Sequence, residues 1–193
     1  MRKKSHISLS RGVIKGLGEQ NIIKHRYTFY IGSIAPDCLP SFLVRRHTME
    51  ETYDVFVKHM EKFVNKLNKK PKVGFMQSIR MGMILHYIAD YFTLPHNSHY
   101  EGGFKDHCVY EGRQLKCMRS YVEKFRNDRL KLEAPKILCD IKQIGEYVKS
   151  RHQEYVKLHQ GVKDDCRFSL ETCICVALSL LGMCDDTLGL ATA

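Results

Sequence analysis

Apolar residues recur at intervals of three and four along most of this chain, which is the spacing that places side chains on one face of an α-helix. The clearest case predicts an amphipathic helix that ends before Pro71, with apolar positions at Met49, Tyr53, Phe56, Met60, Phe63 and Leu67. The same spacing predicts a helix over residues 73–92, ended by Pro95, with apolar positions at Phe75, Ile79, Met83, Tyr87 and Tyr91. Two helices are therefore expected in the middle of the chain.

Helical spacing also marks much of the remaining chain. Ser5 is a candidate cap, Pro135 interrupts the pattern, and we expect five further helices over residues 5–17, 21–31, 107–131, 137–158 and 169–184. Residues 32–40 are rich in Gly and Pro and predict turns. We find no convincing strand alternation, internal repeat or linker. The pattern predicts one all-α domain of about six to eight helices, which spans residues 1–193.

The composition fits a globular domain of this size. The 193 residues are 44% hydrophobic and 10% aromatic, which suits one domain and leaves no room for a large second one. Thirty-one Lys and Arg residues against twenty-one Asp and Glu residues give a formal charge of +10. This excess favours an anionic partner such as a phosphate ester, a nucleic acid or an acidic membrane surface, although general solubility accounts for it equally well.

Segments typical of export or membrane insertion are not recognised. The first residues are basic, but glycines and charges between Gly12 and Glu19 interrupt the apolar stretch that a secretion signal requires. The longest apolar run, residues 173–183, is shorter than the roughly 20 residues that cross a bilayer. Eight scattered cysteines without a Cys-x-x-Cys pair indicate reduced thiols and argue against a zinc ribbon. We therefore expect a cytoplasmic monomer.

Histidines and carboxylates gather between residues 86 and 111. His86 and Asp90 are four residues apart, as are His107 and Glu111, so each pair lies on one face of a helix. A buried Asp90 needs a partner, and a hydrogen bond to His86 would be sufficient by itself. Shared metal coordination accounts better for both pairs together with His96. Imidazole and carboxylate ligands suit zinc, although manganese and iron stay open.

Three other residues are ambiguous by type alone. Asp37 lies in a segment that prolines make rigid, where it either points at a site or accepts hydrogen bonds as an ordinary turn aspartate. His47 lies near the start of the helix that begins at about Met49, where an exposed histidine is the simpler interpretation. His6 is ambiguous in the same way.

In their order along the chain, these residues resemble the pattern of the zinc-dependent bacterial phospholipases C. The matching motifs are Ser5-His6-Ile7, Gly32-Ser-Ile-Ala-Pro36-Asp37, His47, His86-Tyr-Ile-Ala-Asp90, Leu94-Pro95-His96-Asn97 and His107-x-x-x-Glu111. They cover residues 5–111, and the helical remainder matches less specifically. The series H-x-x-x-D, P-H-N and H-x-x-x-E is the specific part of the resemblance.

The resemblance implies an all-α domain around a polynuclear zinc site of two or three ions at the bottom of a cleft. The implied ligands of one zinc are Asp37, His47, His86 and Asp90, and those of a second are His96, His107 and Glu111. Asp90 would also bridge to a third zinc that it shares with His6.

Two departures from the family pattern bear on these assignments. Family members bind the third zinc partly through the amino group of a mature N-terminal tryptophan, whereas this sequence has no Trp and its Met1 lies five residues before His6. Choline-selective members have an aromatic residue just after the aspartate that matches Asp37, and here that residue is Cys38. Choline selectivity is therefore not supported. The separate C-terminal lipid-binding domain of the larger toxins is also not matched.

A cluster of this kind is suited to the hydrolysis of phosphodiesters. Divalent cations about 3.5–4 Å apart bind phosphate oxygens, lower the pKa of a bound water and stabilise the charge that develops during an in-line displacement. Asp37 is the candidate general base. Tyr87, Asn97 and His99 are candidate neighbours of the ligands, and His99 is also an alternative ligand.

Three functions stay open from the sequence. The first is a phospholipase C that hydrolyses the glycerol–phosphate bond of a glycerophospholipid, in contact with an anionic membrane surface. The second is another phosphodiesterase, as in the fungal single-strand nucleases of similar fold, and the positive charge fits a nucleic acid equally well. The third is a non-catalytic protein stabilised by metals. A set of three ligands leaves an open coordination position, which favours an enzyme.

Overall fold

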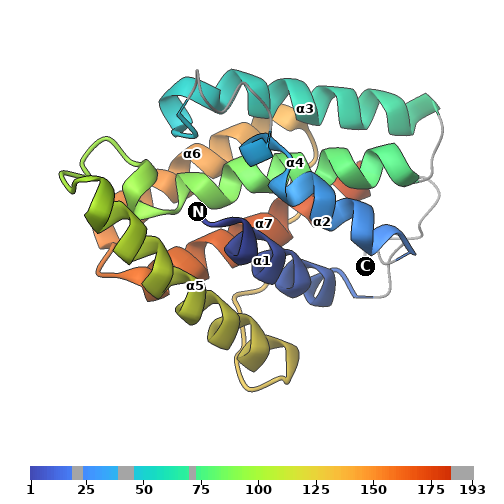
Figure 1. Cartoon of the computed structure of the whole chain (residues 1–193). Coiled ribbons are helices and arrows are strands. Elements are labelled where there is room, and N and C mark those ends of the chain that lie inside the picture. Colours follow the sequence, from blue (N-terminus) through green and yellow to red (C-terminus); the bar gives the residue numbers. More distant parts are fainter. Residues whose placement is uncertain (19–23, 39–45, 70–72, 184–193) are drawn as a thin grey trace.

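A computed structural model describes residues 1–18, 24–38, 46–69 and 73–183. These residues form α-helices and short 3-10 helices and contain no strand, which confirms the predicted all-α class (Figure 1). The elements are α1 (Lys3–Gly16), α2 (Arg26–Ile34), η2 (Pro36–Cys38), α3 (Met49–Lys69), α4 (Phe75–Tyr91), η4 (Leu94–His96), α5 (Phe104–Arg126), α6 (Ile141–Leu158) and α7 (Val162–Gly182).

The two helices predicted most clearly, α3 and α4, lie within two residues of the expected bounds wherever those residues are described. At the N-terminus, the predicted cap is wrong, because Ser5 is buried inside the first turn of α1 and the capping position is Arg2. The predicted second helix continues three residues further, to Ile34. The predicted boundary positions 21–23, Pro40, Pro71 and Cys184 lie outside the described residues.

The last three helices differ more from the prediction, because local caps determine where they begin. α5 begins at Phe104, before His107, since the Asp106 carboxylate accepts a hydrogen bond from Gly103 N at 3.1 Å. α6 begins only at Ile141, where Asp140 Oδ1 accepts a hydrogen bond from Gln143 N at 2.7 Å. α5 ends at Arg126 rather than at residue 131, and α7 begins at Val162 rather than at residue 169.

α4 is the central helix of the fold and packs against α1, α2, α3 and α7 (Figure 1). A helix enclosed in this way must be apolar on almost all sides, and Ile84, Leu85, Ile88 and Ala89 are all buried. His86 and Asp90 share this helix and are therefore carried into the interior with it. None of the helices in the described part of the chain has the length and apolar character needed to cross a membrane.

α2 approaches α4 at backbone contact distance, because glycine occupies both helices at the crossing. A Cβ atom added to Gly32 would collide with the backbone carbonyl of Ile79, and one added to Gly82 would collide with the carbonyl of Phe29. The close approach brings the Ser33 carbonyl to 2.9 Å from His86 Nδ1. It also places η2, which follows α2 directly, beside His86 of α4.

We expect Gly82→Ala to lower the free energy of unfolding by about 2 kcal/mol or more, because its methyl group would force α2 away from α4. Thermal unfolding followed by circular dichroism would measure the loss. Gly112→Ala on α5 is the matched control, since its methyl group would lie 3.6 Å from Arg2 Nη2, an ordinary contact. Equal stability of the Gly82 variant and the wild-type protein would contradict the close crossing.

Candidate metal centre

Asp90 lies at the centre of the predicted ligands and is fully buried. Its Oδ2 atom lies 3.0 Å from His47 Nδ1 and 3.2 Å from His86 Nε2. Its Oδ1 atom faces the other way, 2.8 Å from the amino group of Met1 and 3.4 Å from His6 Nε2. One carboxylate therefore faces His47 and His86 with one oxygen and His6 and the Met1 amino group with the other, as a bridging ligand must.

The first set joins Asp37, His47, His86 and Asp90, whose candidate ligand atoms all lie within 4.8 Å of one another. Asp37 comes from η2, and its Oδ1 atom lies 3.6 Å from both His47 Nδ1 and His86 Nε2. The residues span 54 positions of the chain, from Asp37 to Asp90. They meet only because α2 packs on α4 and because the segment before α3 brings His47 to the same place.

His86 is held in an orientation that suits a metal ligand. The Ser33 carbonyl can only accept a hydrogen bond, so Nδ1 of His86 carries the proton and donates it over 2.9 Å. The opposite nitrogen, Nε2, points at His47 Nδ1, 2.9 Å away. A backbone carbonyl behind an imidazole is the usual way in which proteins orient histidine ligands.

The second set joins His96, His107 and Glu111, again with candidate ligand atoms within 4.8 Å of one another. Along one face of α5, His107 Nε2 lies 3.2 Å from Glu111 Oε1, and His96 Nε2 approaches the same oxygen from η4 at 3.7 Å. The amino group of Met1 lies between the two sets, 2.7 Å from His96 Nε2 and 3.0 Å from Glu111 Oε1.

His6 shows most directly that a metal fits here. Its ring is buried and stacks on the ring of His86 with 4.1 Å between centroids. Within the described part of the chain, Nδ1 of His6 has no hydrogen-bond partner, and Nε2 has only the long 3.4 Å contact with Asp90 Oδ1, which is not aligned as a hydrogen bond. Burial, followed by the charge of His86, lowers the pKa of His6 to about 3, so its ring is neutral and offers a lone pair. A buried imidazole left unsatisfied is costly, and a cation beside Asp90 would satisfy it.

The charges of the site also suit a cation. Burial works against ionisation of Asp90, but the Met1 amino group and His96 outweigh it and hold the Asp90 pKa well below its usual value. Burial likewise opposes ionisation of Glu111, and hydrogen bonds and charges from His96 and Met1 lower its pKa. Sets of histidine nitrogen and carboxylate donors, such as two histidines with one glutamate, occur in catalytic zinc sites.

A cleft of about 650 Å³ opens beside these residues. Three of the predicted ligands, His47, His96 and His107, form part of its wall. Arg46 and the aromatic residues Tyr100 and Phe104 are also part of the lining. A small molecule in this cleft would therefore contact members of both sets.

The three predicted neighbours of the ligands lie in different surroundings. Tyr87 makes edge contacts with the rings of His47 and His86. Asn97 is buried, and its amide donates to the carbonyls of Tyr91 and Thr93 at 3.2 and 2.9 Å. His99 is exposed and belongs to neither set.

His152 on α6 was not among the residues predicted from the sequence. Its Nε2 atom donates to Asn97 Oδ1 at 2.6 Å, and Asn97 in turn holds the turn that carries His96. Fifty-five positions separate the two residues, and no motif joins them. His152 and Asn97 therefore act as positioning residues for His96, which only the packing of α6 could identify.

We expect His152→Ala to weaken zinc binding about tenfold, because Asn97 would lose the contact that fixes the His96 turn. Competition with a fluorescent zinc chelator would measure the change. Gln153→Ala, at the exposed next position, is the control and should bind zinc as the wild-type protein does. An unchanged affinity in the His152 variant would exclude a positioning role.

Zinc affinity is also expected to rise with pH. Burial lowers the pKa of His86, but Asp90 and Asp37 together have a larger effect, and the net result is a raised pKa. At the Met1 amino group, burial also lowers the pKa, and the charges of Asp90 and Glu111 again raise it above its usual value. Both groups hold a proton that a metal must displace, so acid opposes binding. Calorimetry in buffers of different ionisation enthalpy should show proton release, with affinity increasing from about pH 6 to 8. Affinity that is constant or decreases over this range would contradict the assignment.

Comparison with known proteins bears on the family of the chain. No curated protein and no solved structure matches it. A family model described as zinc dependent phospholipase C matches residues 5–161, which is more than half of the chain and includes every predicted ligand. Together with the His and Asp cluster able to hold a metal, this match shows that the chain belongs to the zinc-dependent phospholipase C family.

Proposed function

We propose that this protein is a zinc-dependent phosphodiester hydrolase that acts as a phospholipase C and cleaves glycerophospholipids between glycerol and phosphate. The observation that carries the proposal is the position of Asp90, whose Oδ2 atom faces His47 and His86 while its Oδ1 atom faces His6 and the Met1 amino group, with the set of His96, His107 and Glu111 and a cleft of about 650 Å³ close by. Membership of the family supports the same reaction class. The number of ions, two or three, is part of the proposal.

In this proposal one zinc is held by the set that contains Asp37 and a second by the set that contains Glu111. Asp90, His6 and the amino group of Met1 are the candidate ligands of a third. Bound zinc would supply positive charge for the phosphate oxygens and for a water molecule of lowered pKa. The protein residues would orient the substrate and handle the proton.

Asp37 is our candidate for the general base. Both of its contacts with the histidines use Oδ1, and we assign to Oδ2 the role of accepting the proton of the attacking water. Burial raises the pKa of Asp37, which increases its affinity for that proton. The short helix η2, packed behind α2, would keep the carboxylate aimed at the site.

The cleft lining supports a substrate that has both charge and apolar surface. Arg46 is exposed at the cleft, and a guanidinium group binds phosphate oxygens well. Phe104 is 84% exposed and lies in the same lining, where it would contact the apolar part of a lipid. We further propose that the protein is a cytoplasmic monomer that meets its substrate at an anionic membrane surface.

The first test is metal content, measured by mass spectrometry on protein purified without a metal-affinity column. We expect two or three zinc ions per chain, and a loss of at least one in Asp90→Asn, because the variant amide is a much weaker ligand than the carboxylate it replaces. If the variant retains all of its zinc ions, Asp90 is not a zinc ligand. A folded wild-type protein without metal would refute the hydrolase proposal.

The second test compares turnover of phosphatidylglycerol vesicles with turnover of single-stranded DNA. His96→Ala should lower activity at least about 100-fold, because it removes one of the few donors at the open side of the centre. His99→Ala is the matched control, since this exposed histidine lies three residues away and in neither set. Cleavage of DNA but not of lipid would make the chain a nuclease, and cleavage of neither substrate would contradict the proposal.

A further inference from the structure

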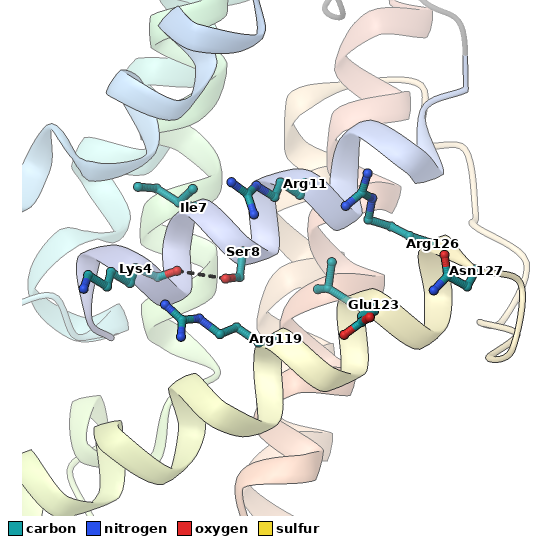
Figure 2. A pocket seen from close by; sticks show the side chains of 9 residues that line it. Lys4, Ile7, Ser8, Arg11, Arg119, Glu123, Arg126 and Asn127 are labelled. Atoms are coloured by element: carbon teal, nitrogen blue, oxygen red, sulfur yellow. Dashed lines mark hydrogen bonds between the residues drawn. The ribbon is translucent and has the colours of Figure 1, made fainter.

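A second cavity, of about 640 Å³, lies between α1 and α5 and is lined by different residues from the cleft at the metal centre (Figure 2). Four of its lining residues are cationic: Lys4 and Arg11 on α1, and Arg119 and Arg126 on α5. We call this cavity the basic groove. Among the described residues that line it, Glu123 is the one carboxylate.

The cations of the basic groove are arranged as two facing rows. The helices run parallel, because the start of α1 meets Glu111 on α5 while Lys15 near its end lies 3.0 Å from Asp128. Each row holds two cations seven residues apart, which is about 10 Å along a helix. In Figure 2 Lys4 and Arg119 lie towards one end of the groove and Arg126 towards the other, with Arg11 between them.

Among the described residues, these four side chains have no partner of opposite charge at salt-bridge distance. In the part of the chain that the structure describes, none of them takes part in a salt bridge, although other cations such as Arg151 and Arg167 do. Four exposed cations that converge on one cavity repel one another. An anion in the groove would relieve this repulsion, and the guanidinium groups offer planar pairs of donors that match phosphate oxygens.

The shape and the remaining lining restrict the class of anion. A concave cavity of about 640 Å³ is the size of a small-ligand site and does not match the flat surface of a bilayer. A single-stranded nucleic acid would need aromatic side chains on which its bases stack, and the described lining contains none. Its apolar part consists of Ile7 and Val122 only, while Ser8 and Asn127 add polar groups.

We propose that the basic groove binds a small anion that carries at least two phosphate groups, one towards each end of the facing rows of cations. The proposal is independent of the metal centre, because none of the predicted zinc ligands lines the groove. Free oligophosphates and lipid headgroups with several phosphates share this chemistry.

The test is calorimetric titration of the full chain with inorganic tripolyphosphate, compared with orthophosphate. We expect wild-type protein to bind tripolyphosphate more tightly than orthophosphate, and Arg119→Gln/Arg126→Gln to bind it about tenfold or more weakly, because each lost guanidinium removes charge-assisted hydrogen bonds. Lys142→Gln/Lys157→Gln is the matched control, since it removes the same charge from exposed positions on α6. Thermal unfolding would verify that both double variants fold.

Further comparisons separate the outcomes. If vesicles that carry a lipid with a multiply phosphorylated headgroup compete with tripolyphosphate, the basic groove binds such a lipid headgroup. His96→Ala should bind tripolyphosphate as the wild-type protein does, whereas loss of binding in that variant would place the anion at the metal centre and overturn the proposal. Equal weakening in both double variants, no preference over orthophosphate, or tighter binding of single-stranded DNA would overturn it as well.

Discussion

An ionised carboxylate buried inside a helical core is the constraint on which this structure depends. Asp90 lies on the most enclosed helix, where an unpaired charge would cost several kcal/mol. Its compensation comes from four groups in three parts of the chain: the N-terminus and α1 bring the Met1 amino group and His6, the segment before α3 brings His47, and α4 itself brings His86. The elements around α4 must therefore meet at one point.

Close packing and hydrogen bonds support the site from behind its candidate ligands. The backbones of α2 and α4 touch at Gly32 and Gly82, and this contact brings the Ser33 carbonyl to the back of His86. On the other side, Asn97 and His152 hold the turn of His96. A site that must present several donors to one cation needs such support, because small displacements of each ligand weaken the whole set. Packing and chemistry are thus joined through hydrogen bonds behind the ligands.

α1 and α5 combine two charge environments at different places on the helix pair. Towards the interior they carry His6 and Glu111, which converge on Asp90 and its neighbours. Towards solvent they carry the cations that line the basic groove. Much of the excess positive charge of the chain is scattered, but here a helix pair concentrates it in a cavity separate from the metal centre.

Periodicity alone determined the all-α class and the positions of α3 and α4, because regular apolar spacing over five turns leaves little choice of conformation. It also determined that His86 pairs with Asp90 and His107 with Glu111, since residues four apart on a helix must be neighbours. The starts of α5 and α6 depended on hydrogen bonds that the carboxylates of Asp106 and Asp140 accept from the backbone N–H groups of Gly103 and Gln143, and the apolar spacing does not reveal these bonds.

Only the tertiary structure decided which other groups each of these pairs meets. Three contacts join elements that are distant in the sequence: the hydrogen bond from His86 Nδ1 to the Ser33 carbonyl, the contact of His152 with Asn97, and the convergence of His6, His47 and the Met1 amino group on Asp90. The physical reason is that a local pattern specifies which way a side chain points from its own helix. Which group this side chain meets on a neighbouring helix depends on how closely the two helices pack. Glycines at a crossing set that distance, but only once the partner helix is in place.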